Sequence, residues 1–147
     1  MLEFEDSARS EAPPEEVWKI LYDPARFTEW WEGMETTSVG DGEFTLQHVD
    51  LPELQIPNRL EVRDAGSAVV ISCLLHDFVY DWRLEPLDGG RATRISVQVA
   101  IPDDKVERFE EFQRAMMGAS VRRLAEVAAE AAGPAQYGPI PQTESGQ

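Results

Sequence analysis

The sequence predicts an α+β fold in which one antiparallel sheet of about seven strands is covered by a long carboxy-terminal helix. Apolar and polar residues alternate in short runs over most of residues 34–102. Turns that contain glycine separate these runs at 40–42, 64–66 and 88–90, which is typical of a meander of antiparallel strands. After residue 102 the apolar residues recur every three or four positions, which is the period of a helix.

A strand and two short helices are predicted at the amino terminus. Residues 2–10 alternate between apolar and polar side chains, as in a half-buried strand. Pro13 and Pro14 then indicate a helix start, because a proline in the first turn removes no helical hydrogen bond. Asp23 followed by Pro24 indicates a second start, with the aspartate as N-cap.

Six further strands and the long helix complete the predicted order. The strands are placed near residues 34–39, 43–49, 58–64, 68–75, 78–86 and 92–101, and the segment 50–57, with two prolines, is predicted to be a loop. Asp103 and Asp104 begin the final helix, which runs to about residue 132, where Gly133 and Pro134 end it. We therefore expect one domain over residues 1–132 and a flexible tail over 133–147.

Composition excludes several classes of function. The 147 residues contain 13 Lys plus Arg against 28 Asp plus Glu, and the net charge of -15 disfavours binding to nucleic acid. The amino terminus lacks the basic and apolar regions of a signal peptide, and no apolar run is long enough to span a membrane, so we expect a cytoplasmic protein. Two widely separated histidines and one cysteine indicate no metal site, and we expect no cofactor. A homodimer is compatible with the sequence, which does not determine the oligomeric state.

Three motifs carry a family resemblance. They are APPEEVW at residues 12–18, YDPARFTEWW at 22–31, and WRLEP at 82–86 ahead of the Gly89-Gly90 turn. With them the sequence resembles the SRPBCC superfamily, of the START and birch-pollen-allergen type, and is most similar within it to the polyketide cyclase/dehydrase group. The resemblance covers about residues 1–132 and implies a helix-grip fold, in which a curved sheet wraps around the long helix and encloses a cavity. Members of the superfamily include lipid carriers, hormone-binding proteins, aromatase/cyclases and chaperone activators.

Strand parity predicts which side chains would line such a cavity. On the strand that begins at Phe78, the aromatic residues share one face and the charged residues share the other. The candidate ligand-binding residues are Phe44, Leu46, Leu60, Val62, Ile71, Cys73, Phe78, Trp82, Ile95, Val97 and Val99 from the strands, with Phe109, Phe112 and Met116 from the helix. The alternative is that these side chains fill a solid core.

Three residues are candidates for acid/base chemistry in this cavity. His48 and Tyr80 have inward parity, and a histidine beside a tyrosine can exchange a proton with a bound carbonyl compound. Asp6 has inward parity on the first strand and is the third candidate. For His48 the alternative is a structural hydrogen bond to backbone or water, and for Asp6 it is exposure to solvent. His76 lies in a predicted turn and is expected to be exposed.

The sequence supports three alternative hypotheses about function. The leading hypothesis is binding of a hydrophobic small molecule, such as a polyketide, lipid or aromatic metabolite, in the internal cavity. The second is a cofactor-free aromatase/cyclase that folds a poly-β-ketone chain and assists aldol closure and dehydration. The resemblance implies a pocket arginine for that activity, whereas Arg59, Arg63, Arg83 and Arg94 all have outward parity. The third is a protein-partner role like that of the chaperone activators, with the acidic surface as the contact.

Overall fold

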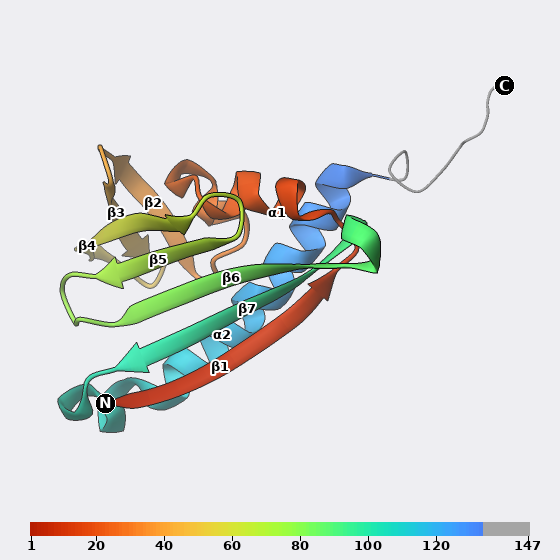
Figure 1. The fold of residues 1–147 in the computed structure, drawn as a ribbon. Coiled ribbons are helices and arrows are strands. Elements are labelled where there is room, and N and C mark those ends of the chain that lie inside the picture. The colour runs from red at the N-terminus through yellow and green to blue at the C-terminus, as the bar shows by residue number, and fades with distance from the viewer. Residues whose placement is uncertain (134–147) are drawn as a thin grey trace, which may run out of the picture.

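The computed structural model describes residues 1–133, and its fold is the predicted α+β arrangement of a curved antiparallel sheet and a long carboxy-terminal helix (Figure 1). Except for Gly133, the predicted flexible tail lies outside the described residues. The elements in chain order are β1 (Leu2–Ser10), α1 (Pro14–Leu21), η1 (Pro24–Glu29), β2 (Met34–Val39), β3 (Glu43–His48), β4 (Leu51–Asp64), β5 (Ala68–Cys73), β6 (Val79–Leu87), η2 (Asp88–Gly90), β7 (Ala92–Ile101) and α2 (Asp103–Ala132).

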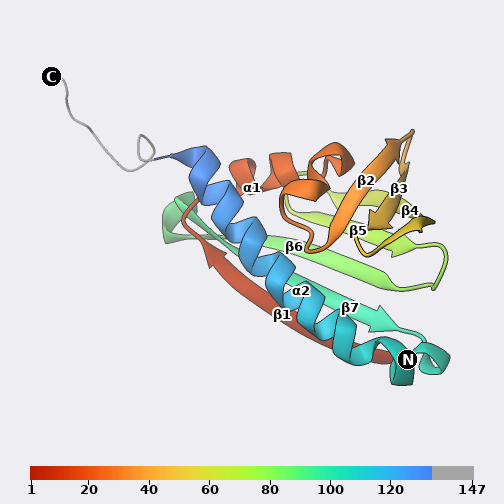
Figure 2. The same cartoon turned by 180° about the vertical axis from the view of Figure 1, so that it is seen from behind.

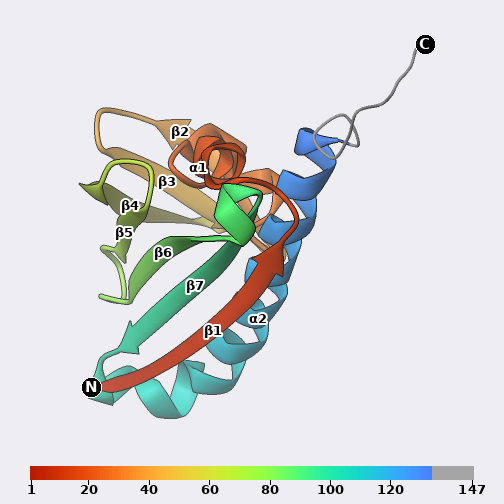
Figure 3. The same cartoon turned by 45° about the vertical axis from the view of Figure 1, so that its right-hand side comes forward.

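The seven strands form one sheet in the order β1-β7-β6-β5-β4-β3-β2, with every pair antiparallel. Helix α2 runs along one face of this sheet and contacts β1, β7 and α1 (Figures 1 and 2). In Figure 3, β1 follows the length of α2, and α1 lies near the carboxy-terminal half of that helix. The helix-grip prediction is confirmed in both the order and the layering of the elements.

The two predicted short helices are present, and the second is a 3-10 helix. Pro14 occupies the first turn of α1, where its missing N–H costs no hydrogen bond. Asp23 caps η1, since its side chain accepts a hydrogen bond of 3.1 Å from the Ala25 N–H. These two elements bring Phe27, Trp30 and Trp31 into the core, where Trp30 packs edge-on against Trp82 of β6 with ring centroids 5.1 Å apart.

The predicted loop at residues 50–57 is wrong, because β4 begins at Leu51 and pairs with β3 along this segment. Strand β5 ends at Cys73, opposite Asn58, so this first half of β4 has a strand partner on one edge only. A proline removes one backbone donor, and a strand with a free edge tolerates that loss. Pro52 and Pro57 are therefore compatible with a strand that local sequence patterns do not indicate.

Hydrogen bonds attach the carboxy-terminal half of α2 to the rest of the fold. The Ser10 hydroxyl donates to the Ala125 carbonyl at 2.8 Å, and the Ser120 hydroxyl accepts from the Glu32 N–H at 2.9 Å. The amino-terminal half of α2 lies instead over the cavity described next, which leaves room for a ligand between that half and the sheet.

Candidate ligand-binding cavity

A cavity of about 310 Å³ lies between the amino-terminal half of α2 and the strands β2 to β6. Its lining comes mainly from these strands and the helix, with Trp31 added from the segment between η1 and β2. The lining residues are Trp31, Met34, Leu46, His48, Asp50, Leu51, Leu54, Ile56, Asn58, Cys73, His76, Phe78, Tyr80, Arg108, Phe109, Phe112 and Gln113. Most of these side chains are apolar or aromatic, which is the usual makeup of a small-molecule site.

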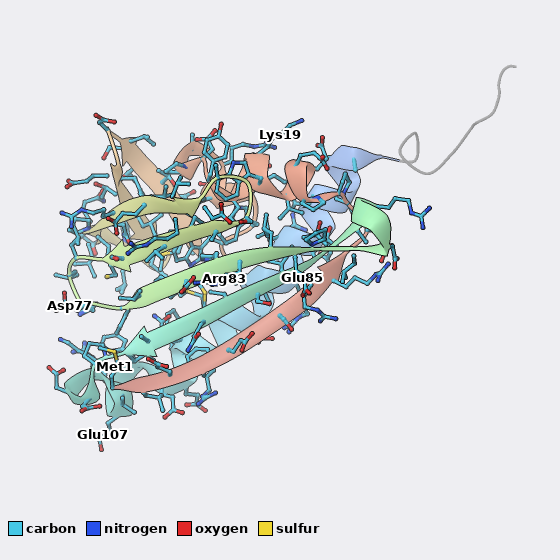
Figure 4. The ribbon with its side chains drawn as sticks, in the orientation of Figure 1. Met1, Lys19, Asp77, Arg83, Glu85 and Glu107 are labelled. Atoms are coloured by element: carbon cyan, nitrogen blue, oxygen red, sulfur yellow. The ribbon has the colours of Figure 1, made fainter. Side chains whose placement is uncertain are left out.

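The mouth of the cavity is open to solvent and includes exposed apolar side chains. Leu51 and Leu54 of β4 and Phe112 of α2 line the cavity and are 53%, 40% and 45% exposed. Figure 4 labels Asp77, in the turn between β5 and β6, and Glu107, in the first turns of α2, at the same end of the molecule. The exposed part of the lining therefore lies between β4 and α2.

Tyr80 and Gln113 form the buried polar pair of the lining. The Tyr80 hydroxyl donates to the Gln113 side-chain carbonyl at 2.9 Å, and both residues are almost fully buried. Burial raises the pKa of Tyr80 well above its usual range, so the phenol stays protonated at neutral pH. Its lone pairs and the Gln113 amide N–H groups remain polar contacts that the wall could offer to a ligand.

His48 lies at the end of β3 with part of its ring in the lining. Its Nδ1 accepts a hydrogen bond of 3.0 Å from the Asp50 N–H, so in the neutral ring Nε2 carries the hydrogen. Gly33 makes room for this ring, because a Cβ there would lie 3.0 Å from Nε2 and the glycine has φ +76°. The structural hydrogen bond considered for His48 is therefore present, and it coexists with a position in the cavity wall.

His76 lines the cavity, so the expectation of an exposed turn residue is wrong. Its ring centroid lies 4.8 Å from that of Phe109 and 5.4 Å from that of Phe78. Within residues 1–133 its buried Nδ1 has no hydrogen-bond partner. Burial, with a smaller contribution from the cations Lys105 and Arg108, lowers the pKa of His76 below its ordinary value of 6.5, so the ring is neutral at pH 7.

The structure brings some of the predicted site residues together and separates others. His48 and Tyr80 line the cavity, as do five of the predicted ligand-binding residues, Leu46, Cys73, Phe78, Phe109 and Phe112. The buried residues Phe44, Ile71, Trp82, Ile95, Val97, Val99 and Met116 have the predicted inward orientation but belong to the solid core, and Leu60 packs against that core. The cavity is therefore confined to one end of the sheet, because α1 and the aromatic residues that follow it occupy the other.

Val62 and Asp6 lie outside the cavity for two different reasons. Val62 is 48% exposed because β3 begins at Glu43, opposite Arg59, and leaves the end of β4 as a sheet edge. Asp6 faces the middle of α2, where its Oδ2 approaches Gly118, and its Oδ1 accepts a hydrogen bond of 2.9 Å from the Ser7 N–H. The structure does not bring Asp6 together with His48 and Tyr80.

Several lining residues were not predicted from the sequence. Leu51, Leu54 and Ile56 belong to the segment predicted as a loop. Gln113 is a polar residue within the apolar stripe of the last helix. Its position next to Phe112 could have indicated from the sequence that it faces the cavity. Arg108 supplies an arginine from the helix. The four strand arginines are exposed, as parity predicted, and Figure 4 shows Arg83 among them on β6.

Comparison with known families identifies the fold group. A family model described as polyketide cyclase / dehydrase and lipid transport matches residues 1–130. The chain belongs to this family. No protein of curated function matches the sequence. Within residues 1–133, no helix is both long enough and apolar enough to cross a membrane.

Solved structures of the same fold confirm the architecture of this polyketide cyclase/dehydrase and lipid transport domain. Protein XoxI from Bacillus cereus is 14% identical and superposes with a TM-score of 0.73 over 90% of this chain and 99% of its own. A Chromobacterium violaceum protein is 16% identical, with a TM-score of 0.69 over 88% of this chain and 99% of its own. A Rhodobacter sphaeroides protein is 21% identical, with a TM-score of 0.65 over 87% of this chain and 92% of its own.

Proposed function

We propose that this protein binds a hydrophobic small molecule in the cavity between the sheet and α2. The observation that carries the proposal is the cavity of about 310 Å³, which has a mostly apolar lining and exposed apolar side chains at its mouth. An apolar ligand in this cavity would leave water and make packing contacts with the apolar wall. Membership of a family that includes lipid transport agrees with this function.

The volume limits the size of the ligand. At the share of about 30 Å³ that a water-sized group takes in a liquid, the cavity encloses roughly ten to twelve non-hydrogen atoms. A medium-chain aliphatic molecule or a two-ring aromatic molecule fits this space, and a longer molecule would extend through the mouth between Leu54 and Phe112.

The same volume favours binding over the cyclase alternative. A site that directs the closure of a poly-β-ketone chain holds the reacting part of the chain in one geometry. A long chain would extend beyond the volume of about 310 Å³ that this cavity offers. His48 and Tyr80 do share the lining, but the Tyr80 proton is already donated to Gln113. Acid/base roles for His48, Tyr80 and Asp6 therefore stay predictions from the sequence.

Titration with the neutral fluorescent probe N-phenylnaphthylamine, whose third ring would extend into the mouth, tests the proposal. We expect saturable binding with a rise in fluorescence as the probe leaves water. Cys73→Phe places an aromatic ring on the cavity wall and should weaken probe binding by about tenfold or more, because it removes the space for the probe.

Ser72→Phe is the matched control for this titration. It makes a similar change at the neighbouring position of β5, on the opposite face of the sheet, and should leave probe affinity unchanged. Circular dichroism checks that both variants are folded. Equal probe affinity in the wild type and in Cys73→Phe would contradict a binding site in this cavity.

A further inference from the structure

An unpaired arginine lies at the cavity in a protein whose cations are mostly paired. The lysines and arginines that form ion pairs with a carboxylate are Arg9, Lys19, Arg26, Arg59, Arg63, Arg83, Arg94, Arg114 and Arg123. Within residues 1–133, Arg108 and Lys105 on the first turns of α2 have no such partner, although the chain carries 28 acidic residues. Arg108 is also part of the cavity lining.

The guanidinium of Arg108 belongs to a small stack of rings at this end of the cavity. Its central carbon lies 5.1 Å from the centroid of the Phe109 ring, and the Phe109 ring in turn contacts His76. The exposed position of Arg108 leaves its N–H groups free to reach a ligand at the mouth. A planar guanidinium matches a carboxylate with two parallel hydrogen bonds, and this pairing is among the strongest in proteins.

The charges around His76 indicate the same ligand chemistry. Lys105 and Arg108 both disfavour the protonated form of His76, while Asp77 opposes them more weakly. The His76 Nδ1 is buried, and no group within residues 1–133 bonds to it. At the His76 ring the two cations therefore outweigh Asp77, and an anionic group placed beside this ring would be attracted to Arg108 and Lys105.

The acidic residue of the cavity lining does not pair with Arg108. Asp50 is the only acidic side chain in the lining that residues 1–133 provide, and its side chain is 85% exposed. Its carboxylate lies 4.0 Å from the Nδ1 of His48 and forms no ion pair with Arg108. The cationic group of Arg108 is thus available to a ligand.

We propose that the ligand is a hydrophobic carboxylate whose anionic group binds Arg108 beside His76, while its apolar part lies against Leu46, Phe78 and Tyr80. The inference rests on the proposed function and adds that the bound hydrophobic molecule carries a negative charge. Medium-chain fatty acids and two-ring aromatic acids share this chemistry and match the enclosed volume.

Displacement of N-phenylnaphthylamine by matched pairs of acid and alcohol tests the proposal. The pairs are decanoate with decanol and naphthoate with naphthol, so that each pair keeps its apolar body and differs in its anionic group. In the wild type we expect each carboxylate to displace the probe at a concentration about tenfold below that of its alcohol, from the added charge-assisted hydrogen bonds. The pair with the larger preference identifies the aliphatic or the aromatic source.

Two arginine variants test whether Arg108 causes the preference for carboxylates over alcohols. Arg108→Gln should weaken the carboxylates by about tenfold and leave the alcohols unchanged, because only the charged hydrogen bonds are lost. Arg91→Gln removes another arginine with no ion pair in the described part of the chain, outside the cavity lining, and should change neither class. Equal displacement by acid and alcohol in the wild type, or an equal loss for both in Arg108→Gln, would overturn the carboxylate proposal.

Nuclear magnetic resonance titration of His76 gives a readout other than affinity. In the free protein the pKa of His76 should lie below 6.5, and bound decanoate should raise it, because a nearby anion favours the imidazolium. Bound decanol should not raise it. An unchanged pKa with decanoate bound would overturn the placement beside His76, whereas failure of the neutral probe to bind at all would overturn the proposed function itself.

Discussion

At the scale of single residues, Gly118 of α2 lies against the Asp6 carboxylate of β1. A Cβ at Gly118 would lie 2.9 Å from the Asp6 Oδ2, which is closer than such atoms normally come. The Asp6 carboxylate is held by the hydrogen bond from the Ser7 N–H, so it cannot swing away without loss. This contact opposes a side chain at Gly118, whereas helix propensity alone favours alanine there.

A double-mutant cycle tests this explanation. Gly118→Ala should lower the free energy of unfolding by about 1 kcal/mol, because the clash exceeds the gain in helix propensity. In an Asp6→Ala background the clash is absent, and the same substitution should raise the free energy of unfolding by up to about 1 kcal/mol. Urea denaturation measures both, and an identical effect of Gly118→Ala in the two backgrounds would refute the contact as the cause.

At the scale of the elements, the two halves of α2 have different roles. The carboxy-terminal half is fixed by the hydrogen bonds of Ser120 and Ala125 to the segments around η1 and β1. The amino-terminal half carries Arg108, Phe109, Phe112 and Gln113 over the cavity. One helix therefore supplies both the anchor of the fold and the wall of the site.

Ser120→Ala tests the anchor. The substitution leaves the Glu32 N–H without its acceptor, and an unsatisfied donor at a partly buried site costs about 1–3 kcal/mol. We expect that loss in urea denaturation, together with faster hydrogen exchange at the Glu32 amide. Ser72→Ala, at a half-buried serine on β5, is the control and should change stability by less than about 0.5 kcal/mol. Equal losses in the two variants would show that the Ser120 hydrogen bond does not anchor the helix.

At the scale of the whole molecule, the net charge of -15 belongs to the surface, whereas the cavity wall is mostly uncharged. The charged side chains that form ion pairs with one another are largely exposed. Exposed ion pairs contribute little to stability. Repulsion among the excess carboxylates should therefore outweigh these pairs.

Salt should stabilise the protein for this reason. Screening shortens the range of charge repulsion to about 10 Å at 0.1 M ionic strength, so the melting temperature should rise by a few degrees between about 0.02 M and about 0.5 M sodium chloride. Thermal unfolding followed by circular dichroism measures the shift, with sodium chloride chosen because chloride binds proteins weakly. A melting temperature that falls over this range would mean that the ion pairs dominate.

The sequence by itself determined the order of the elements, the fold class and the inward face of most strands. These features depend on how often apolar residues recur along the chain, every two residues in a strand and about every three and a half in a helix. This spacing can be seen in the sequence before any tertiary contact is known. The position of Tyr80 and Cys73 in the lining followed from the same parity, and the motifs around Pro14 and Asp23 marked the helix starts.

Only the tertiary structure decided where the cavity lies and which polar groups enter it. The start of β4 depends on its pairing with β3. The end of the sheet that stays open for the cavity depends on which end α1, η1 and the aromatic residues after them cover. Both features come from contacts between segments that are distant in the sequence. His76 and Arg108 therefore became site residues only once the β5–β6 turn and the first turns of α2 came together, and Gln113 only once α2 packed over Tyr80 of β6. Periodicity assigns a side chain to a face, but the packing of whole elements determines whether that face meets solid core, solvent or a cavity.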